Sequence, residues 1–496
     1  MSFRPAKAAR PSLAALGALA LVLAAPGMLS AQAPAAPAAA PANIPVALRP
    51  DQVALIVKVL SEAESHGFAK GEFAPADLDK LLASQDPAER ARGAALLGIG
   101  SVRYAEAQRG ERIAPKAFVK DWSIRPEPFA AGSSFAQAAQ ANTLDAWFAS
   151  LPPPYQGYQT LREALARYRG LAAAGGWPAI PASEMSLKPG MDDPRTPILR
   201  QRLAVEDPET PAAAEDPAKP NLFDPGLVKA LGRFQQRHGI KPDGAVGKDT
   251  LAELNKPVEY RIGQILANLE RWRWLPRTAP ADRIEVNIAA QTLERYQANK
   301  LVMFMRTVAG RKTDPTPILR SDIHSVVLNP PWNVPTSIAT KELWPKQRAD
   351  PSYFEKEEIS VQPNGTLQQR AGPKSALGKF KFDFVNSFGV YLHDTPAQSA
   401  FGVEARAVSH GCVRLEKPAD LAKALLAGSP EWPTQKIDAV LQGGDTTRAR
   451  LPQPVPVYLL YWTVYQDAQA QLNFRRDIYD WDARLLRLLD AGKTHA

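Results

Sequence analysis

Cysteine is almost absent from this sequence, because Cys412 is the only one among 496 residues. A single cysteine excludes a disulfide within the chain, and a lone thiol is a liability in an oxidising compartment. Its ordinary explanation would be a buried, inert core residue. The neighbouring His410 and Gly411 argue against that explanation and indicate a reactive thiol.

Long apolar runs are also lacking. The run Leu13–Ala25 is shorter than the about 20 residues that a bilayer span needs. It follows three basic residues and precedes Ala31-Gln32-Ala33, where small residues stand at the spacing of a cleavage site. We therefore predict a cleaved export signal over residues 1–33.

Neither sign of charge dominates the chain, whose formal net charge is +9. Such a charge favours anionic surfaces such as wall polymer, but it says nothing about chemistry. No predicted helix carries the clustered basic residues of a DNA-recognition helix, so we expect no nucleic-acid partner.

Proline, by contrast, is abundant at 46 residues. It gathers in an Ala/Pro stretch over residues 34–47 and a Pro-rich acidic stretch over residues 204–221, and both are predicted linkers. A chain this long needs several domains. Between the linkers, apolar residues recur at steps of three and four, which predicts an all-α scaffold domain over residues 48–203.

Residues 222–256 have the pattern of a compact helical unit. Asp224-Pro225 is a typical helix start, and Leu227, Leu231 and Phe234 form one apolar stripe before a turn at Pro242-Asp243-Gly244. The unit resembles the small three-helix peptidoglycan-binding module of wall enzymes. A DNA-binding helix-turn-helix is the competing interpretation, and the export signal disfavours it.

Residues 257–280 are predicted to be a connecting helix, with Trp272 and Trp274 near its end. The two indole rings could stack on sugar or dock one domain onto another. We expect docking, because an aromatic stripe on a helix is usually packing.

At Arg283 the apolar period changes to two, which indicates a strand, and Gln297-Ala298-Asn299-Lys300 is a predicted hairpin turn. We predict a β-rich catalytic domain over residues 281–466, folded as a sandwich or a barrel-like sheet, in a multidomain α+β protein. The Pro-rich residues 330–372 are predicted to form a lid over a cleft. Residues 467–496 are predicted to be a C-terminal tail.

The predicted chemistry centres on Cys412 and on His393, which lies nineteen residues earlier. In a strand Tyr391 and His393 face one side while Asp394 faces the other, which argues against an Asp-His-Cys triad. A backbone carbonyl is then expected to orient the imidazole. A thiol needs a base to become a thiolate, and His393 is the predicted base.

The residues around Cys412 supply further candidates. Gly411 permits a turn in which backbone N–H groups approach an oxyanion, and Tyr391 is a second donor. His410 is the rival base. Arg414 fits two roles equally, a salt-bridge partner or a clamp for a substrate carboxylate.

A zinc site made by His393, His410 and Cys412 is a weaker alternative. Such a ligand set occurs in proteins, but no His-x-x-x-His or Cys-x-x-Cys spacing supports it here. We expect neither a metal nor another cofactor.

His393, fifteen intervening residues and Ser409-His410-Gly411-Cys412-Val413-Arg414 together resemble the signature of the L,D-transpeptidase family. The predicted layout resembles the large periplasmic subgroup of that family. Ser375 departs from the subgroup, which more often has asparagine there. Further matching positions are these: Gly372-Pro373-Lys374, Ala376-Leu377-Gly378, Lys381-Phe382, Tyr391 to Pro396, Phe401, Arg406 and Leu415.

The resemblance implies a periplasmic cysteine acyltransferase acting on peptidoglycan stem peptides and glycan. Cys412 would be the nucleophile, His393 the general base and Tyr391 an oxyanion donor, with Ser409, His410, Gly411 and Arg414 near the substrate. The enzyme would expel D-alanine from a tetrapeptide stem, hold a thioester and form a 3→3 cross-link. Wall-synthesis enzymes would be partners, and carbapenems would acylate Cys412.

Three alternatives stay open at this point. An L,D-carboxypeptidase would hydrolyse the same thioester, and a related enzyme would transfer the acyl group to a lipoprotein lysine. A non-catalytic protein could use residues 222–256 only to bind the wall, although Cys412 and His393 argue against that.

Overall fold

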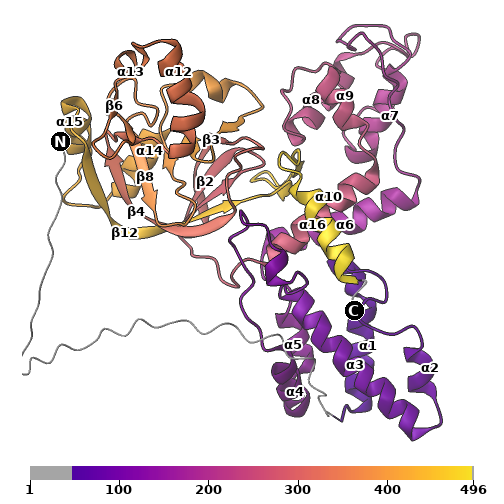
Figure 1. Cartoon of the computed structure of the whole chain (residues 1–496). Helices are drawn as coiled ribbons and strands as arrows, with labels where there is room; N and C mark the ends of the chain where they lie inside the picture. The colour runs from indigo at the N-terminus through magenta and orange to yellow at the C-terminus, as the bar shows by residue number, and fades with distance from the viewer. Residues whose placement is uncertain (1–46, 494–496) are drawn as a thin grey trace, which may run out of the picture. The chain divides into compact units, whose positions relative to one another are not determined.

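The computed structural model describes residues 47–493. The predicted signal peptide and nearly all of the first linker lie outside the described residues. The described chain is helical at first, β-rich in its second half and helical again at its end (Figure 1). Between residues 47 and 493, no helix is both long and apolar enough to cross a membrane.

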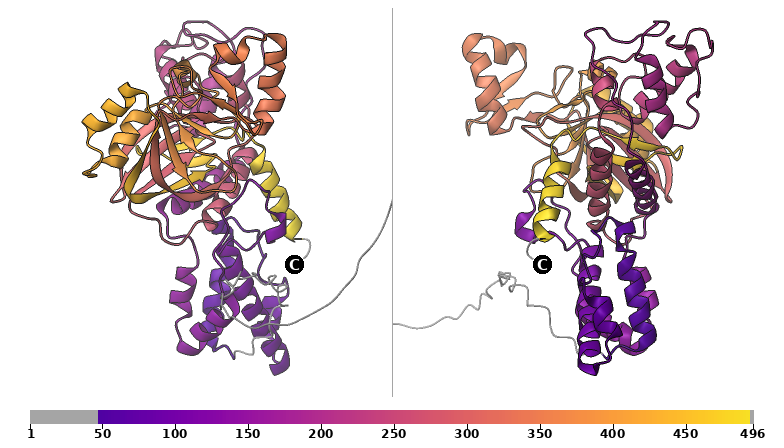
Figure 2. Two further views of the ribbon diagram at one scale, coloured as in Figure 1. Left: turned by 60° about the vertical axis from the view of Figure 1, so that its left-hand side comes forward. Right: turned by 90° about the vertical axis from the view of Figure 1, so that its right-hand side faces the viewer.

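The first helices pack around a hydrophobic core of their own. In Figure 2 they lie side by side, with α1 contacting α3 and α5, and α4 contacting α3 and α5. Their apolar stripes meet at buried residues such as Ile56, Leu97, Phe135 and Phe148. The predicted helical character of this stretch is confirmed, with these bounds: α1 (Pro50–Ser61), α2 (Leu78–Ala83), α3 (Pro87–Gln108), α4 (Ala131–Ala141), α5 (Leu144–Ser150) and α6 (Gln156–Ala173).

A second core joins α7 (Thr196–Glu206), α8 (Pro225–Arg237) and α9 (Lys248–Leu254). The Asp224 side chain caps α8 by accepting the N–H of Leu227 at 2.8 Å, as its sequence position predicts. Leu199 and Leu203 of α7 belong to this core, so the boundary predicted at residue 203 falls inside a helix. The boundary was predicted from the acidic composition that begins at residue 204, which is typical of an exposed linker. The start of this stretch is instead buried, and Glu206 forms an ion pair with Arg202.

The β-rich region is a closed sheet. Its strands are β1 (Arg283–Asn287), β2 (Thr292–Gln297), β3 (Lys300–Gly310), β4 (Leu319–Leu328), β8 (Phe380–Phe384), β9 (Leu392–His393), β10 (Ala407–Ser409), β11 (Val413–Leu415) and β12 (Thr447–Leu460). They follow the order β10-β3-β11-β9-β8-β4-β12-β1-β2, and β2 also pairs with β3, which closes the ring. Of the two predicted forms, the structure is the barrel.

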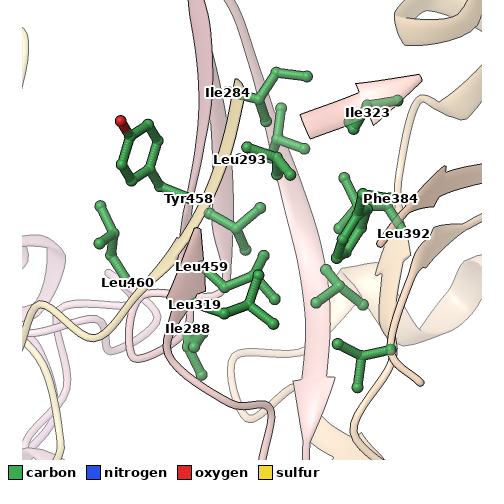
Figure 3. Close-up of a cluster of buried hydrophobic side chains, with 14 of the residues drawn as sticks. Ile284, Ile288, Leu293, Leu319, Ile323, Phe384, Leu392, Tyr458, Leu459 and Leu460 are labelled. Atoms are coloured by element: carbon green, nitrogen blue, oxygen red, sulfur yellow. The ribbon is translucent and has the colours of Figure 1, made fainter. Parts of the chain in front are cut away.

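Apolar and polar residues alternate along the strands, so that every second side chain lies in the barrel interior. Ile284, Leu293, Ile323, Phe384 and Leu392 converge on one another from different strands (Figure 3). The β2–β3 hairpin turns at Ala298 and Asn299, whose φ angles are 49° and 61°, so the predicted turn is confirmed. Two helices, α14 (Pro418–Leu426) and α15 (Thr434–Gly443), follow β11.

Residues 330–372 form a small folded unit, which we call the insert. Val334, Leu343, Phe354 and Leu367 give it a hydrophobic cluster of its own. The sequence predicted an ordered segment but no regular elements, because short pieces leave little periodicity. Its elements are β5 (Trp332–Asn333), α11 (Thr336–Ile338), the π-helix η3 (Ala339–Leu343), α12 (Trp344–Ala349), α13 (Tyr353–Lys356), β6 (Ile359–Val361) and β7 (Leu367–Gln369).

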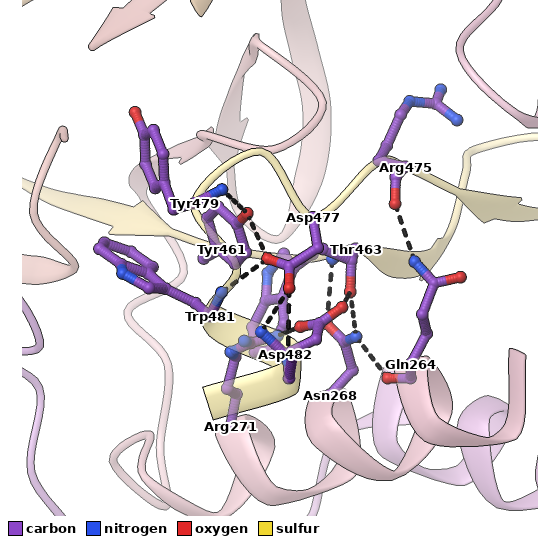
Figure 4. A network of polar contacts seen from close by, with 12 residues as sticks. Gln264, Asn268, Arg271, Tyr461, Thr463, Arg475, Asp477, Tyr479, Trp481 and Asp482 are labelled. Atoms are coloured by element: carbon purple, nitrogen blue, oxygen red, sulfur yellow. Dashed lines mark hydrogen bonds and ion pairs between the residues drawn. The ribbon is translucent and has the colours of Figure 1, made fainter. Parts of the chain in front are cut away.

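The C-terminal residues are structured, although they were predicted to be only a tail. β13 (Val464–Gln466) pairs with β14 (Leu472–Phe474), and α16 (Trp481–Lys493) packs on α10 (Val258–Arg273). Figure 4 shows the polar network that joins them. In it, buried Asp482 binds Arg271 at 2.5 Å and accepts the Thr463 hydroxyl at 2.6 Å.

The two tryptophans at the end of α10 are docking residues, as expected. Trp274 is buried against Trp122, with ring centroids 5.4 Å apart. Trp272 stacks on Trp462 of the barrel at 4.6 Å. Both rings therefore hold α10 against other parts of the chain.

Candidate active site

Two short parallel strands, β9 and β11, carry the predicted catalytic residues. Their register sets His393 opposite Arg414 and Leu392 opposite Val413. Leu392 and Val413 point into the barrel and are fully buried. Because side chains alternate between the two faces of a strand, four predicted residues share the outer face: Tyr391, His393, Cys412 and Arg414.

The Cys412 thiol has a hydrogen-bond partner in the Tyr391 hydroxyl, which is bonded in turn to the Trp332 side chain of the insert. Burial raises the pKa of the Cys412 thiol, and hydrogen bonds from the Tyr391 backbone N–H and then from its hydroxyl partly oppose that rise. Burial and the nearby thiol raise the pKa of Tyr391 as well. The phenol is therefore a hydrogen-bond donor at the sulfur at neutral pH.

His393 is oriented by a backbone carbonyl. Its Nδ1 lies 2.5 Å from the Asp394 carbonyl oxygen, so the predicted orienter is confirmed. The Asp394 carboxylate instead accepts the N–H groups of Lys379 at 2.7 Å and Thr395 at 2.6 Å. Asp394 therefore does not complete an Asp-His-Cys triad, because its carboxylate is bonded to these two N–H groups and not to the imidazole.

The electrostatics around His393 keep it neutral. Burial lowers the pKa of His393 to about 3, with further lowering from Arg414 and Lys381. A neutral imidazole whose Nδ1–H donates to a carbonyl has its lone pair on Nε2. The ring is thus in the protonation state that a general base needs.

The turn before Cys412 depends on two glycines. Gly411 has a φ of 108°, which other residues rarely adopt. A Cβ on Gly310 would lie only 3.0 Å from the Gly411 Cα, so glycine there lets β3 approach the turn. Ser409 closes the turn by donating to the Cys412 carbonyl at 2.6 Å and accepting the Gly411 N–H at 3.2 Å. The Ser409 hydroxyl therefore holds the loop.

Arg414 is half-buried beside His393 without a carboxylate partner among residues 47–493. Its Nε is buried and has no hydrogen bond in this part of the chain. Burial lowers the pKa of Arg414, and the Cys412 thiol opposes that effect. The structure thus contains no salt bridge for Arg414, which was one of its two predicted roles.

His410, the rival base in the sequence analysis, is bonded to a residue of the insert. Its Nε2 lies 2.6 Å from Glu342 Oε1, on η3 of the insert. Glu342 also lies 3.5 Å from a guanidinium nitrogen of Arg311. His410 and Glu342 thereby connect the insert to the loop that carries Cys412.

Sequence reasoning did not single out Glu342 or Gly310, and it named Lys381 only as a family-matching position without a role in the site. The Lys381 ammonium lies 4.6 Å from the Tyr391 ring centroid and 2.8 Å from Asp383. The alternating strand residues Phe380, Phe382 and Phe384 could have placed Lys381 on the outer face. No spacing in the sequence marks Glu342, because its partner lies 68 residues away.

The alternative of a zinc site can be compared with the geometry. Throughout residues 47–493, no three His, Cys, Asp or Glu side chains are gathered so that they could hold a metal ion. His393 is bonded to a carbonyl and His410 to a carboxylate. The two imidazoles therefore have separate partners.

Comparison with known families matches residues 281–434 to the L,D-transpeptidase catalytic domain. The matched stretch contains both His393 and Cys412. Residues 45–165 match a family described as a scaffold domain, and residues 210–254 match one described as "Putative peptidoglycan binding domain". The last two matches precede residues 281–434 in the chain, in the order that the sequence predicted.

A Haemophilus influenzae protein described as "Putative L,D-transpeptidase" is 34% identical over 248 residues. The match spans 46% of this chain and 50% of that relative, so the chain matches about half the length of the relative.

Solved L,D-transpeptidases show a weaker likeness. An enzyme from Mycobacterium smegmatis is 15% identical over 36% of this chain and 58% of its own, with a TM-score of 0.20. An Enterococcus faecium catalytic domain described as acylated by ertapenem is 14% identical over 37% of this chain and 99% of its own, also at 0.20. The likeness to this family rests on the sequence match to residues 281–434, since TM-scores this low carry no structural argument.

Proposed function

We propose that this protein is a periplasmic peptidoglycan L,D-transpeptidase that forms 3→3 cross-links through a thioester on Cys412. The observation that carries the proposal is the outer face of β9 and β11. A thiol, a phenol bonded to it and a neutral imidazole held at Nδ1 share that face within an L,D-transpeptidase domain. These are the groups that acyl transfer through a cysteine requires.

In the first half-reaction the Cys412 thiol gives its proton to His393 Nε2. The thiolate attacks the diaminopimelate carbonyl of a tetrapeptide stem. His393 then gives the proton to the departing amine of D-alanine, the C–N bond breaks and a thioester remains. The free energy of the amide bond is kept in the thioester, so no ATP is needed.

The negative oxygen of the tetrahedral intermediate needs hydrogen-bond donors. The Gly411 N–H already donates to Ser409. We therefore assign this role to the Tyr391 hydroxyl, which is hydrogen-bonded to Cys412, and to the backbone N–H of Cys412 itself.

Arg414 is proposed to bind a carboxylate of the donor stem. It is a cation on the catalytic face without an ion pair of its own in the described chain, and its Nε lacks a partner. A guanidinium suits a carboxylate because it can form two parallel hydrogen bonds.

The remaining parts of the chain fit the same function. Residues 210–254 would hold the enzyme on the wall, and the predicted signal over residues 1–33 would export it. The insert would act as the lid that excludes water from the thioester, since Trp332 and Glu342 both bond to residues of the site. Carbapenems would acylate Cys412 because they present a strained carbonyl to the same thiol.

An L,D-carboxypeptidase is the second candidate, because water attacking the same thioester would release a tripeptide. Incubation of residues 34–496 with a disaccharide-tetrapeptide, with and without acceptor stems, separates the two. A dimeric 3→3 product supports the transpeptidase, whereas tripeptide alone in the presence of acceptor contradicts it.

A further inference from the structure

The pair formed by His410 and Glu342 lies next to the nucleophile, and the first half-reaction does not use it. His410 precedes Cys412 by two residues, and Glu342 comes from the π-helix of the insert. Their nitrogen and oxygen atoms are 2.6 Å apart, and about a third of each side chain is exposed, 29% for His410 and 33% for Glu342. The pair is therefore partly exposed to solvent.

Three charged side chains surround His410. Glu342 is bonded to it, and Asp314 lies close enough to interact with it electrostatically. Arg311 stands between these carboxylates, 3.5 Å from Glu342 and 2.6 Å from Asp314. Once His410 has taken up a proton, the imidazolium would therefore lie against a carboxylate that Arg311 holds in place.

The bond to Glu342 also fixes the tautomer of neutral His410. A hydrogen on Nε2 donates to the carboxylate, which leaves the lone pair on Nδ1. No hydrogen bond occupies that Nδ1 within residues 47–493. His410 thus has a second nitrogen that can accept a proton while Glu342 holds the ring.

The proton balance of the second half-reaction requires such a group. An acceptor amine has a pKa near that of lysine, about 10, and it arrives as R–NH3⁺ at neutral pH. It becomes an amide N–H after losing two protons. One proton passes through His393 to the departing Cys412 sulfur, so the other needs a second base.

We propose that His410 is this second base and that Glu342 is its positioning residue. His410 Nδ1 takes the first proton from the acceptor ammonium, and the neutral amine forms the C–N bond at the thioester carbonyl. His393 then takes the second proton and gives it to the sulfur as the C–S bond breaks. The imidazolium of His410, paired with Glu342, releases its proton to solvent.

This inference rests on the proposed function, and it adds a role for the insert. Water attacking the same thioester needs only one base, so His410 and Glu342 favour the amine over water. Because the insert carries Glu342, the second base is complete only while the insert contacts the His410 loop. The insert would therefore select for cross-linking by chemistry as well as by excluding water.

The test compares Glu342→Gln with the wild-type protein in each half-reaction. Thioester formation with a tetrapeptide donor, followed by intact-protein mass spectrometry, should change less than about twofold. The ratio of cross-linked dimer to tripeptide at neutral pH should fall about tenfold. Without the Glu342 carboxylate, His410 is held less well and takes the proton of the acceptor ammonium less efficiently. Raising the pH should restore the ratio, since the amine then arrives uncharged.

Two controls separate this role from a structural one. Glu355→Gln removes an exposed carboxylate of the same insert and should change neither measurement. Hydroxylamine is uncharged at neutral pH, so it should react with the Glu342→Gln thioester as fast as with the wild-type one. Glu342→Asp should recover part of the dimer ratio.

Three results would overturn the inference. An unchanged dimer ratio in Glu342→Gln would mean that His410 takes no proton from the acceptor. Equal losses with hydroxylamine and with the stem amine, or an equal loss of thioester formation, would mean that Glu342 acts only on structure. Failure of the wild-type protein to form any thioester would instead refute the proposed function, and this inference with it.

Discussion

His393 Nδ1 lies 2.5 Å from the carbonyl oxygen of Asp394, the next residue in the chain. This bond fixes the imidazole with a neutral backbone group rather than with a carboxylate. The ring therefore gains orientation without the stabilisation of its charged form that a carboxylate would give. Burial and the neighbouring cations then lower its pKa to about 3.

The first prediction concerns pH. Activity that needs neutral His393 should persist as pH falls through 6.5, and it should be lost only near the lowered pKa. The rate constant for acylation by a carbapenem should therefore change less than about twofold between pH 7 and pH 5. A histidine with the ordinary pKa would lose about 25-fold over that range.

Stopped-flow measurement of acylation against pH checks this, with circular dichroism at each pH to verify folding. Folding itself should weaken towards low pH, because unfolded histidine binds a proton that buried His393 does not. An acid limb with its midpoint near 6.5, in protein that is still folded, would contradict the assigned environment of His393.

The second prediction tests whether a backbone carbonyl or a triad carboxylate orients His393. Asp394→Asn keeps an oxygen acceptor for one of the two backbone N–H groups that the carboxylate binds. Acylation should then fall less than about fivefold, whereas loss of a triad aspartate costs about 10⁴-fold. His393→Gln, which removes the base itself, should lower acylation at least about 100-fold and serves as the comparison. A collapse of Asp394→Asn to the His393→Gln level would refute this geometry.

The third prediction concerns the phenol at the sulfur. Tyr391→Phe keeps the ring beneath Lys381 and removes only the hydroxyl bonded to Cys412. Loss of one oxyanion donor should lower kcat by about 10- to 1000-fold with little change in KM. Steady-state cross-linking kinetics measure the split. A rise in KM at constant kcat would show that the hydroxyl binds the ground state instead.

The fourth prediction concerns Arg414. Because it has no ion pair in the described chain, Arg414→Gln should cost little stability. Donor KM should rise about tenfold or more if the guanidinium binds a stem carboxylate. Donors whose diaminopimelate carboxylate is amidated provide the control, since wild type and variant should then have equal KM. If Arg414→Gln also had a higher KM than wild type for the amidated donor, Arg414 would not bind that carboxylate.

The fifth prediction concerns the insert. Replacing residues 344–356 with a short linker removes α12 and α13 but keeps Trp332 and Glu342. Hydrolysis should then rise relative to cross-linking, because water reaches the thioester more easily. Chromatography of dimer and tripeptide gives the ratio. If the shortened protein kept the wild-type ratio, the insert would not be a lid against water.

The sequence predicted well which side chains share the outer face of β9 and β11, because local rules govern that arrangement. Strand alternation placed Tyr391 with His393 and turned Asp394 away, and the glycine before Cys412 marked the turn. The hairpin at Ala298 and Asn299 likewise follows from short-range turn chemistry. Each of these features depends on residues within a few positions of one another.

Long-range relationships were beyond such rules. The bond between Glu342 and His410 joins two folded parts through residues with no common pattern. The C-terminal helix α16 was missed for the same reason, since its place depends on Asp482 meeting Arg271 of α10. Pairing of β2 with β3 closes the barrel only when all the strands of the sheet are in place. The alternation of apolar residues therefore could not distinguish a sandwich from a barrel.

The most direct test of the central claim is intact-protein mass spectrometry of residues 34–496 after incubation with a disaccharide-tetrapeptide, with peptide mapping of any adduct. The account predicts a thioester on Cys412 with release of D-alanine, absent in Cys412→Ala, and a 3→3 dimer when acceptor stems are present. A wild-type protein that stays unmodified, or an adduct on any other residue, would contradict it.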